Sequence, residues 1–117
     1  MALPIITADQ RLAEPRGIKG TIFGSGALVM DNDFHHPGEN WSWNTDCTKN
    51  ARPVVIGRGV FVGARAIILK GVTIGDRAVI GAGAVVVRDV PAGMVAAGNP
   101  ARILGPHQAT PPAAVVK

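Results

Sequence analysis

The chain has 117 residues, the length of one small domain; 47% of them are hydrophobic but only 4% are aromatic. Its net charge of +4 comes from Lys and Arg residues spread singly along the chain, which disfavours nucleic-acid binding. No apolar run approaches the roughly 18 residues that span a bilayer, and the N-terminus lacks a signal-peptide pattern. We therefore expect a cytoplasmic protein that binds neither nucleic acid nor membrane, and whose mild positive charge suits a small phosphate-bearing anion.

The first part of the chain changes from irregular to weakly repetitive. Residues 1–16 mix prolines with polar side chains and are predicted to be an irregular lead-in. A β domain is predicted over residues 17–105. Within it, the hexad FGSGAL, from Phe23 to Leu28, has a glycine and a small residue at the positions that a later repeat uses. The hexads on either side fit less well, so this segment predicts about one degraded coil.

A polar segment then interrupts the repeat, and we predict a projecting loop over residues 35–55. The spacing from Val29 to Ile56 is not a multiple of six, so the phase is broken. This segment holds two of the three histidines and both tryptophans, and long loops in compact domains are often functional. Cys47 is the single cysteine, so neither an intrachain disulfide nor a cysteine-based zinc cage is expected.

From Ile56 to Pro91 an aliphatic residue recurs every six positions without a break. These positions are Ile56, Val62, Ile68, Ile74, Ile80 and Val86. A helix would scatter them around its axis, and a single strand over the whole run would be far too long. Hexapeptide repeats are instead typical of a β-helix, in which three hexads form one triangular coil of about 18 residues. The constant phase also disfavours a valine-rich β-sandwich.

Residues between the interior positions are predicted to form the corners of these coils. Small or branched residues would let the corners fit, and they are Val60, Ala66, Val72, Ala78, Ala84 and Val90. Glycine follows four of the aliphatic positions, where a corner requires φ > 0 or close chain approach. The repeat ends after Pro91, and residues 106–117 are predicted to be a frayed tail. A short solenoid leaves open ends and flat faces, so we expect a homo-oligomer.

The chain resembles the C-terminal part of the hexapeptide-repeat acyltransferases over residues 23–104, above all in the run VVIGRGVFVGARAIILKGVTIGDRAVIGAGAVVVRDVPAGMVAAGNPARI. The likeness is greatest to the sugar and xenobiotic O-acetyltransferases. The resemblance implies an all-β, left-handed parallel β-helix, short for the family and assembled as a homotrimer. It also implies an acetyl-CoA donor in a groove between subunits, no metal, and a histidine base on the projecting loop.

The family's motifs, matched by position, imply five donor-binding residues. Ala64 in VFVGAR and Ala82 in IGAG would lie beside the pantetheine arm of acetyl-CoA, one coil apart. Val87 and Arg88 in VVRD would meet the distal end of the donor, with Val87 in place of a commoner small polar residue. Arg102 in GNPAR would approach the phosphates, which guanidinium groups bind in a two-pronged fashion. Each arginine taken alone is equally well interpreted as a solvated surface residue.

The motif VMDNDFHH places His35 where related enzymes that read D-x-D-F-H have their general base. A neutral imidazole can accept the proton of a hydroxyl that attacks a thioester. Two alternatives stay open: the adjacent His36, and the position of Asn32, where other sugar acetyltransferases carry their histidine. A loop histidine without a catalytic role is a third. Asp31 or Asp33 is predicted either to orient the imidazole or to cap a turn.

The predicted function is acetyl transfer from acetyl-CoA to a hydroxyl of a sugar or related small molecule. Trp41 and Trp43 would form an apolar platform for the acceptor or anchor the loop to a neighbouring subunit. A xenobiotic acetyltransferase and a non-catalytic β-helix assembly protein are the alternatives. A zinc-dependent carbonic anhydrase with hexapeptide repeats is disfavoured, because His35, His36 and His107 lack the required spacing.

Overall fold

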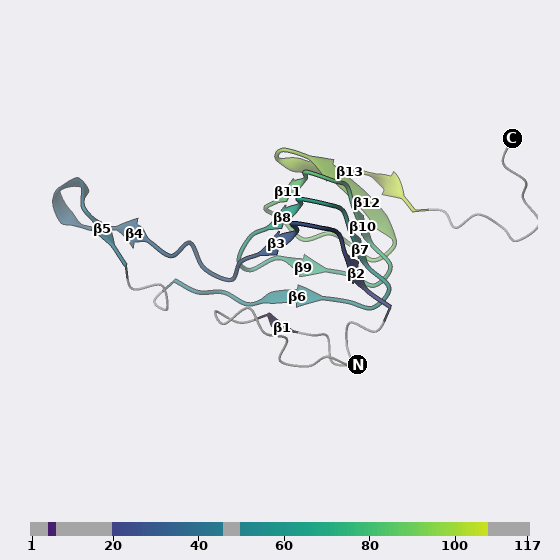
Figure 1. Ribbon diagram of the computed structural model, residues 1–117, viewed down its shortest axis with the longest axis horizontal. Coiled ribbons are helices and arrows are strands. Elements are labelled where there is room, and N and C mark those ends of the chain that lie inside the picture. The colour runs from purple at the N-terminus through teal and green to yellow at the C-terminus, as the bar shows by residue number, and fades with distance from the viewer. Residues whose placement is uncertain (1–4, 7–19, 46–49, 108–117) are drawn as a thin grey trace, which may run out of the picture.

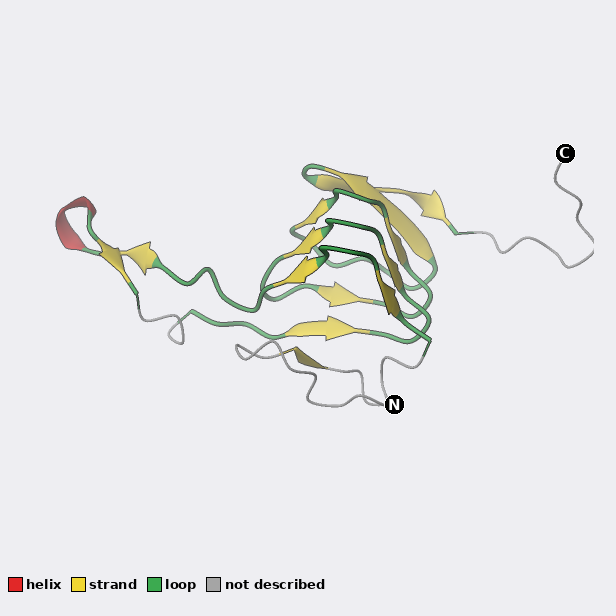
Figure 2. Cartoon of the chain, viewed as in Figure 1, coloured by secondary structure: helices red, strands yellow, loops and turns green. Residues whose placement is uncertain are grey.

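The protein is an all-β solenoid with one long lateral arm (Figure 1). The structure is a computed structural model that describes residues 5–6, 20–45 and 50–107. The only helical element in these ranges is the short 3-10 turn η2 (Glu39–Trp41), drawn in red in Figure 2. The all-β prediction is therefore confirmed. No described helix has the length and apolar character needed to cross a bilayer.

Three sheets run along the solenoid, and each is built from strands of successive coils. The first contains β2 (Ile22–Phe23), β7 (Phe61–Val62), β10 (Val79–Ile80), β12 (Met94–Gly98) and β13 (Ala101–Pro106). The second contains β3 (Leu28–Val29), β8 (Ile67–Ile68) and β11 (Val85–Val86). The third contains β1 (Ile5–Ile6), β6 (Val54–Ile56) and β9 (Thr73–Ile74). The strands are parallel except for β1, which runs antiparallel to β6, and β13, which runs antiparallel to β12.

The register of the parallel strands repeats after one coil. The aligned pairs are Phe61 with Val79, Ile67 with Val85, and Val55 with Thr73. Each pair is 18 residues apart, the same separation as between Arg58 and Asp76, whose carboxylate accepts a hydrogen bond from the Arg58 N–H at 2.9 Å. Three hexads therefore form one coil, as the sequence predicts. The pairings of Ile22 with Phe61 and of Leu28 with Ile67 have a larger separation, because the arm lies between the paired strands in the sequence.

Among the described residues, the interior of the solenoid is a column of aliphatic side chains. The six predicted interior residues from Ile56 to Val86 are each 0–1% exposed, and the predicted corner residues from Val60 to Val90 are 0–3% exposed. Burial of each large aliphatic side chain contributes roughly 1.5–3 kcal/mol relative to exposure. The periodic pattern in the sequence therefore marks the core directly.

Glycine at the predicted corners is required by close chain approach. A Cβ atom added at Gly63 would lie 2.5 Å from the backbone nitrogen of Ala82, and one added at Gly24 would lie 2.5 Å from that of Ala64. Such contacts are too short for any side chain, so successive coils stack backbone against backbone at this corner. The weak hexad that contains Gly24 is thus part of a true coil.

The arm, residues 31–51, leaves the first coil after Met30 and returns at Arg52 (Figure 1). Within it, β4 (His36–Pro37) pairs antiparallel with β5 (Trp43–Asn44) around η2. The sequence predicted a loop without strands over residues 35–55, whereas the structure has this hairpin and β6 begins at Val54. Two-residue strands are too short to produce an alternating pattern, so this small hairpin left no signal in the sequence.

The two ends of the solenoid differ from the sequence expectations. Strand β1 lies inside the predicted irregular lead-in and covers the free edge of β6. At the other end, β12 and β13 form a long antiparallel hairpin that turns between Gly98 and Ala101, where only an end of the repeat was predicted. The remainder of the lead-in, Cys47 and residues 108–117 lie outside the described residues.

Candidate functional site

One outer edge of the solenoid is lined by small side chains. The N–H of Gly83 donates a hydrogen bond to the carbonyl oxygen of Ala64 at 2.9 Å, and the N–H of Arg65 donates to that of Ser25 at 2.9 Å. Ser25, Ala64 and Ala82 therefore follow one another in successive coils, and all three are exposed. The structure brings the two predicted pantetheine-contacting alanines into one column, beside exposed backbone.

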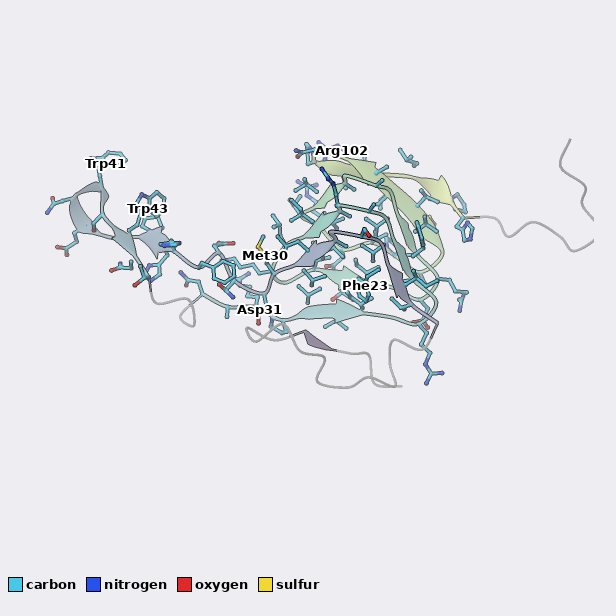
Figure 3. The ribbon with its side chains drawn as sticks, in the orientation of Figure 1. Phe23, Met30, Asp31, Trp41, Trp43 and Arg102 are labelled. Carbon is cyan, nitrogen blue, oxygen red and sulfur yellow. The ribbon has the colours of Figure 1, made fainter. Side chains whose placement is uncertain are left out.

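A pocket of about 150 Å³ lies between the last coil and the β12–β13 hairpin, and both predicted phosphate-binding arginines line it. Arg88 comes from the corner after β11, and Arg102 comes from β13, where Figure 3 shows its side chain at the top of the solenoid. Asp89 lines the same pocket, but its carboxylate accepts a hydrogen bond from the Thr73 N–H at 2.8 Å. Two guanidinium groups at one pocket are suited to an anionic group. Val87 is 43% exposed and is not a lining residue.

The root of the arm is a polar cluster built on two buried side chains. Asp31 is 4% exposed and Asn32 is 2% exposed, and they are the buried polar residues of the described chain. The Asn32 amide donates to a carboxylate oxygen of Asp31 at 2.8 Å, while its own oxygen accepts from the Phe34 N–H at 2.8 Å. The carbonyl oxygen of Asp31 accepts from the Arg52 N–H at 2.7 Å. The bond from Arg52 joins the outgoing and returning segments of the arm, and the other two fix the outgoing segment.

An ion pair links this root to the next coil. The ammonium of Lys70 lies 2.8 Å from a carboxylate oxygen of Asp33. Lys70 occupies the corner after β8, one coil before Arg88, so it is part of the regular repeat. Sequence reasoning missed Lys70 as a site residue. No motif or break in the repeat marks Lys70 in the sequence, because it meets Asp33 only once the coils are stacked.

The two histidines of the arm have different surroundings. His35 is exposed, whereas His36 is half-buried and pairs with Asn44 in the small hairpin. The Nε2 atom of His36 is buried and has no hydrogen-bond partner among the described residues. Within those residues, neither Asp31 nor Asp33 makes a hydrogen bond to an imidazole, because their carboxylates bind Asn32 and Lys70. The predicted direct orientation of the ring by a carboxylate is therefore not seen.

The tip of the arm carries both tryptophans, far from the solenoid in Figure 3. Trp41 is 99% exposed and Trp43 is 66% exposed. They line an open hollow of about 510 Å³ together with Pro37, Gly38, Asn40 and Ser42. All of these residues belong to the arm, so the hollow is separate from the pocket between Arg88 and Arg102.

The described part of the chain contains no group of three or more His, Cys, Asp or Glu side chains that could hold a metal ion. His35 and His36 lie on the arm, while His107 follows β13 at the opposite end of the chain's path. The described residues thus offer three features of a site. These are an exposed imidazole on the arm, small side chains along one outer edge of the solenoid, and two arginines at the pocket beside the β12–β13 hairpin.

Comparison with known proteins identifies the repeat. The family model for the hexapeptide repeat of succinyl-transferase matches residues 53–88. A 2,3,4,5-tetrahydropyridine-2,6-dicarboxylate N-acetyltransferase of Staphylococcus carnosus is 62% identical over 55 residues, 47% of this chain and 23% of that protein. The Staphylococcus aureus protein of the same name is 51% identical over 55 residues, with the same coverage. The chain thus spans 23% of the length of these relatives.

Solved structures extend the likeness to the fold. Galactoside acetyltransferase in complex with coenzyme A has a TM-score of 0.66 and 29% identity, covering 77% of this chain and 44% of its own. A hexapeptide-repeat acetyltransferase of Vibrio cholerae with acetyl coenzyme A has a TM-score of 0.60 and 28% identity, covering 78% and 48%. A maltose O-acetyltransferase of Clostridium difficile has a TM-score of 0.51 and 26% identity, covering 77% and 60%. The chain therefore carries the hexapeptide repeat of this family over residues 53–88, and in sequence and fold it is similar to the hexapeptide-repeat acetyltransferases.

Proposed function

We propose that this chain is the β-helix part of an acetyltransferase that takes its acetyl group from acetyl-CoA. The observation that carries the proposal is the stack of 18-residue coils, because the same repeat and fold occur in acetyltransferases solved with coenzyme A or acetyl coenzyme A. The left-handed sense of the coils is part of this proposal, as the family resemblance implies.

The donor is proposed to lie along the edge of small side chains and to end near the paired arginines. Ala64 and Ala82 leave backbone N–H and C=O groups accessible, and such groups can bind the amides of pantetheine whatever the side chain. Arg88 and Arg102 line one pocket, which supports their proposed role with the phosphate-bearing part of the donor. Val87 is exposed and precedes Arg88 in the chain, and it is proposed to contact the distal end of the donor.

His35 is proposed as the general base. Its ring is exposed, whereas that of His36 is half-buried, so His35 is the better placed to reach an acceptor. The imidazole would accept the proton of the acceptor hydroxyl as the oxygen attacks the thioester carbonyl. The carbon–sulfur bond then breaks, and the imidazolium returns the proton to the sulfur of coenzyme A. The step requires no covalent bond to the protein.

A hydroxyl group of a sugar or related small molecule is the proposed acceptor. Two similar structures, a galactoside acetyltransferase and a maltose O-acetyltransferase, have names that agree with it. An amine acceptor is a second candidate, favoured by the 62% identity to a protein named as an N-acetyltransferase. A xenobiotic acceptor stays an alternative within the hydroxyl class.

A homotrimer with donor grooves between subunits is proposed as the working assembly. Outward-facing apolar residues support self-association, since Ile22 is 60%, Phe61 46% and Leu28 40% exposed in the single chain. The alternative is a β-helix that assembles without catalysing a reaction.

The deciding experiment combines acetyl-CoA binding by calorimetry with an acetyl-CoA-dependent thiol-release screen over sugars, nucleotide sugars, amino acids and phenolic or aminocyclic drugs. Saturable binding together with turnover of a hydroxyl acceptor is expected. Turnover of amines alone would replace the hydroxyl proposal with the N-acetyltransferase candidate. An intact oligomer that does not bind acetyl-CoA would refute the transferase proposal and favour the assembly protein.

A further inference from the structure

The arm leaves the solenoid through a polar cluster that is unusually well bonded for a loop. Asp31 and Asn32 are as buried as the aliphatic core, although a buried polar group is costly unless it is hydrogen-bonded. Asn32 uses both ends of its amide, donating to Asp31 and accepting from the Phe34 N–H. The cluster therefore fixes the backbone over the residues that immediately precede His35.

The hydrogen bond from Phe34 to Asn32 closes a local turn. An Asn side chain that accepts from the N–H two residues ahead forms an Asx-turn, which dictates the direction of the following chain. Phe34 has φ 64, a left-handed conformation that a non-glycine residue adopts at a cost. The direction in which the chain enters His35 is thus set by Asn32 and not by the preference of Phe34.

An ion pair between Asp33 and Lys70 connects the same turn to the solenoid. Asp33 lies between Asn32 and Phe34, and its carboxylate is 2.8 Å from the ammonium of Lys70. Lys70 lies at a corner of the second coil, where the preceding residue is bonded to the next coil: the Leu69 N–H donates to the Val86 carbonyl oxygen at 3.0 Å. The ion pair therefore ties the turn that carries His35 to the rigid part of the molecule.

We infer that Asn32, Asp33 and Lys70 are positioning residues, which act through the Asx-turn to hold the His35 imidazole toward its substrates. This inference rests on the proposed function, in which His35 is the general base. A base must lie within hydrogen-bond reach of the proton that it accepts, and a displacement of about 1 Å can lower a rate by about 10²-fold. A rotation at the root of the arm would displace everything beyond it.

The ion pair offers the sharper test, because Asn32 is buried and its removal risks unfolding the first coil. Asp33→Asn and Lys70→Met are each expected to lower kcat about tenfold while leaving the KM for acetyl-CoA unchanged. The double variant is expected to lose no more than either single variant, because the two side chains act as one unit. Lys70→Arg, which keeps the positive charge, should restore kcat to within about twofold of the native value. Arg58→Met, at an exposed cation on a different corner, is the matched control and should be neutral.

A second readout does not depend on activity. In ring-carbon NMR spectra of the Asp33→Asn and Lys70→Met variants, the His35 signals should shift or broaden while those of His107 stay in place. A fall in kcat without any change at His35, or additive losses in the double variant, would overturn the inference. If His35→Ala retains native turnover, the proposed base is wrong, and the NMR response alone then decides whether the ion pair positions His35.

Discussion

The solenoid and the arm are stabilised in opposite ways. From Val54 onward the coils of the solenoid bury aliphatic side chains that are 0–3% exposed, and their strands pair with strands of neighbouring coils. The arm has no buried apolar side chain among its described residues and is held at its root by hydrogen bonds and one ion pair. Stability is therefore concentrated in the solenoid, while the candidate base and both tryptophans lie on the arm.

This difference separates two kinds of substitution. A change in the aliphatic column should lower stability and affect activity only through unfolding, whereas a change on the arm should affect activity and leave stability almost intact.

The largest effect is expected in the core, where strand β8 offers two adjacent isoleucines with opposite orientations. Ile68 is fully buried, and Ile68→Ala should lower the free energy of unfolding by about 3 kcal/mol because it leaves a cavity between coils. Ile67 points outward and is half-buried, so Ile67→Ala should cost about 1 kcal/mol. Chemical denaturation of both variants makes the comparison. Equal losses would show that the inward column is not the source of stability.

At the candidate base, His35, a substitution is expected to lower activity and leave stability unchanged. His35→Ala should lower kcat by at least about 10²-fold, because the proton of the acceptor no longer has a base in reach. The unfolding midpoint and the affinity for acetyl-CoA should not change, since the ring is exposed. His107→Ala, at an exposed histidine after β13, is the control. A large loss of activity in His36→Ala, with native turnover in His35→Ala, would transfer the role to His36.

The same contrast explains what the sequence could predict. The column from Ile56 to Val86 was predictable because a repeat imposes one environment on many positions, and each position repeats the same signal. The glycine corners were predictable for the same reason, and Gly63 needs its small size where Ala82 approaches. Even the weak first coil was recognisable from Gly24.

The arm has no repeat, so its geometry depends on particular pairs. Nothing in the sequence pattern links Lys70 to Asp33, because they lie on different coils and meet only once the solenoid is stacked. Asp31 or Asp33 is predicted from the sequence to orient the imidazole or to cap a turn, yet their carboxylates bind the Asn32 amide and the Lys70 ammonium. The pairing of Arg88 with Arg102 in one pocket likewise depends on the β12–β13 hairpin, which no periodicity predicted.

A smaller effect is expected at the pocket lined by Arg88 and Arg102, where the solenoid is proposed to bind the phosphates of acetyl-CoA. Arg88→Met and Arg102→Met should each weaken acetyl-CoA binding about tenfold, because each removes a guanidinium partner of the phosphates. The losses should shrink at high salt, which screens exposed charges. Calorimetry at two salt concentrations measures both effects, with Arg58→Met as the control for a change of net charge. Unchanged affinity in both variants would mean that these arginines are solvated surface residues.

The smallest effect on stability is expected at the tip of the arm. Trp41 is 99% exposed, so Trp41→Ala removes almost no contact within the chain and should change the free energy of unfolding by less than about 0.5 kcal/mol. Denaturation at several protein concentrations provides the measurement. A larger loss that grows with protein concentration would mean that the indole packs against a second copy of the chain, because mass action links oligomer stability to concentration. A larger loss independent of concentration would contradict the separation of solenoid and arm, since it would require a contact inside one chain that stabilises the fold from the tip.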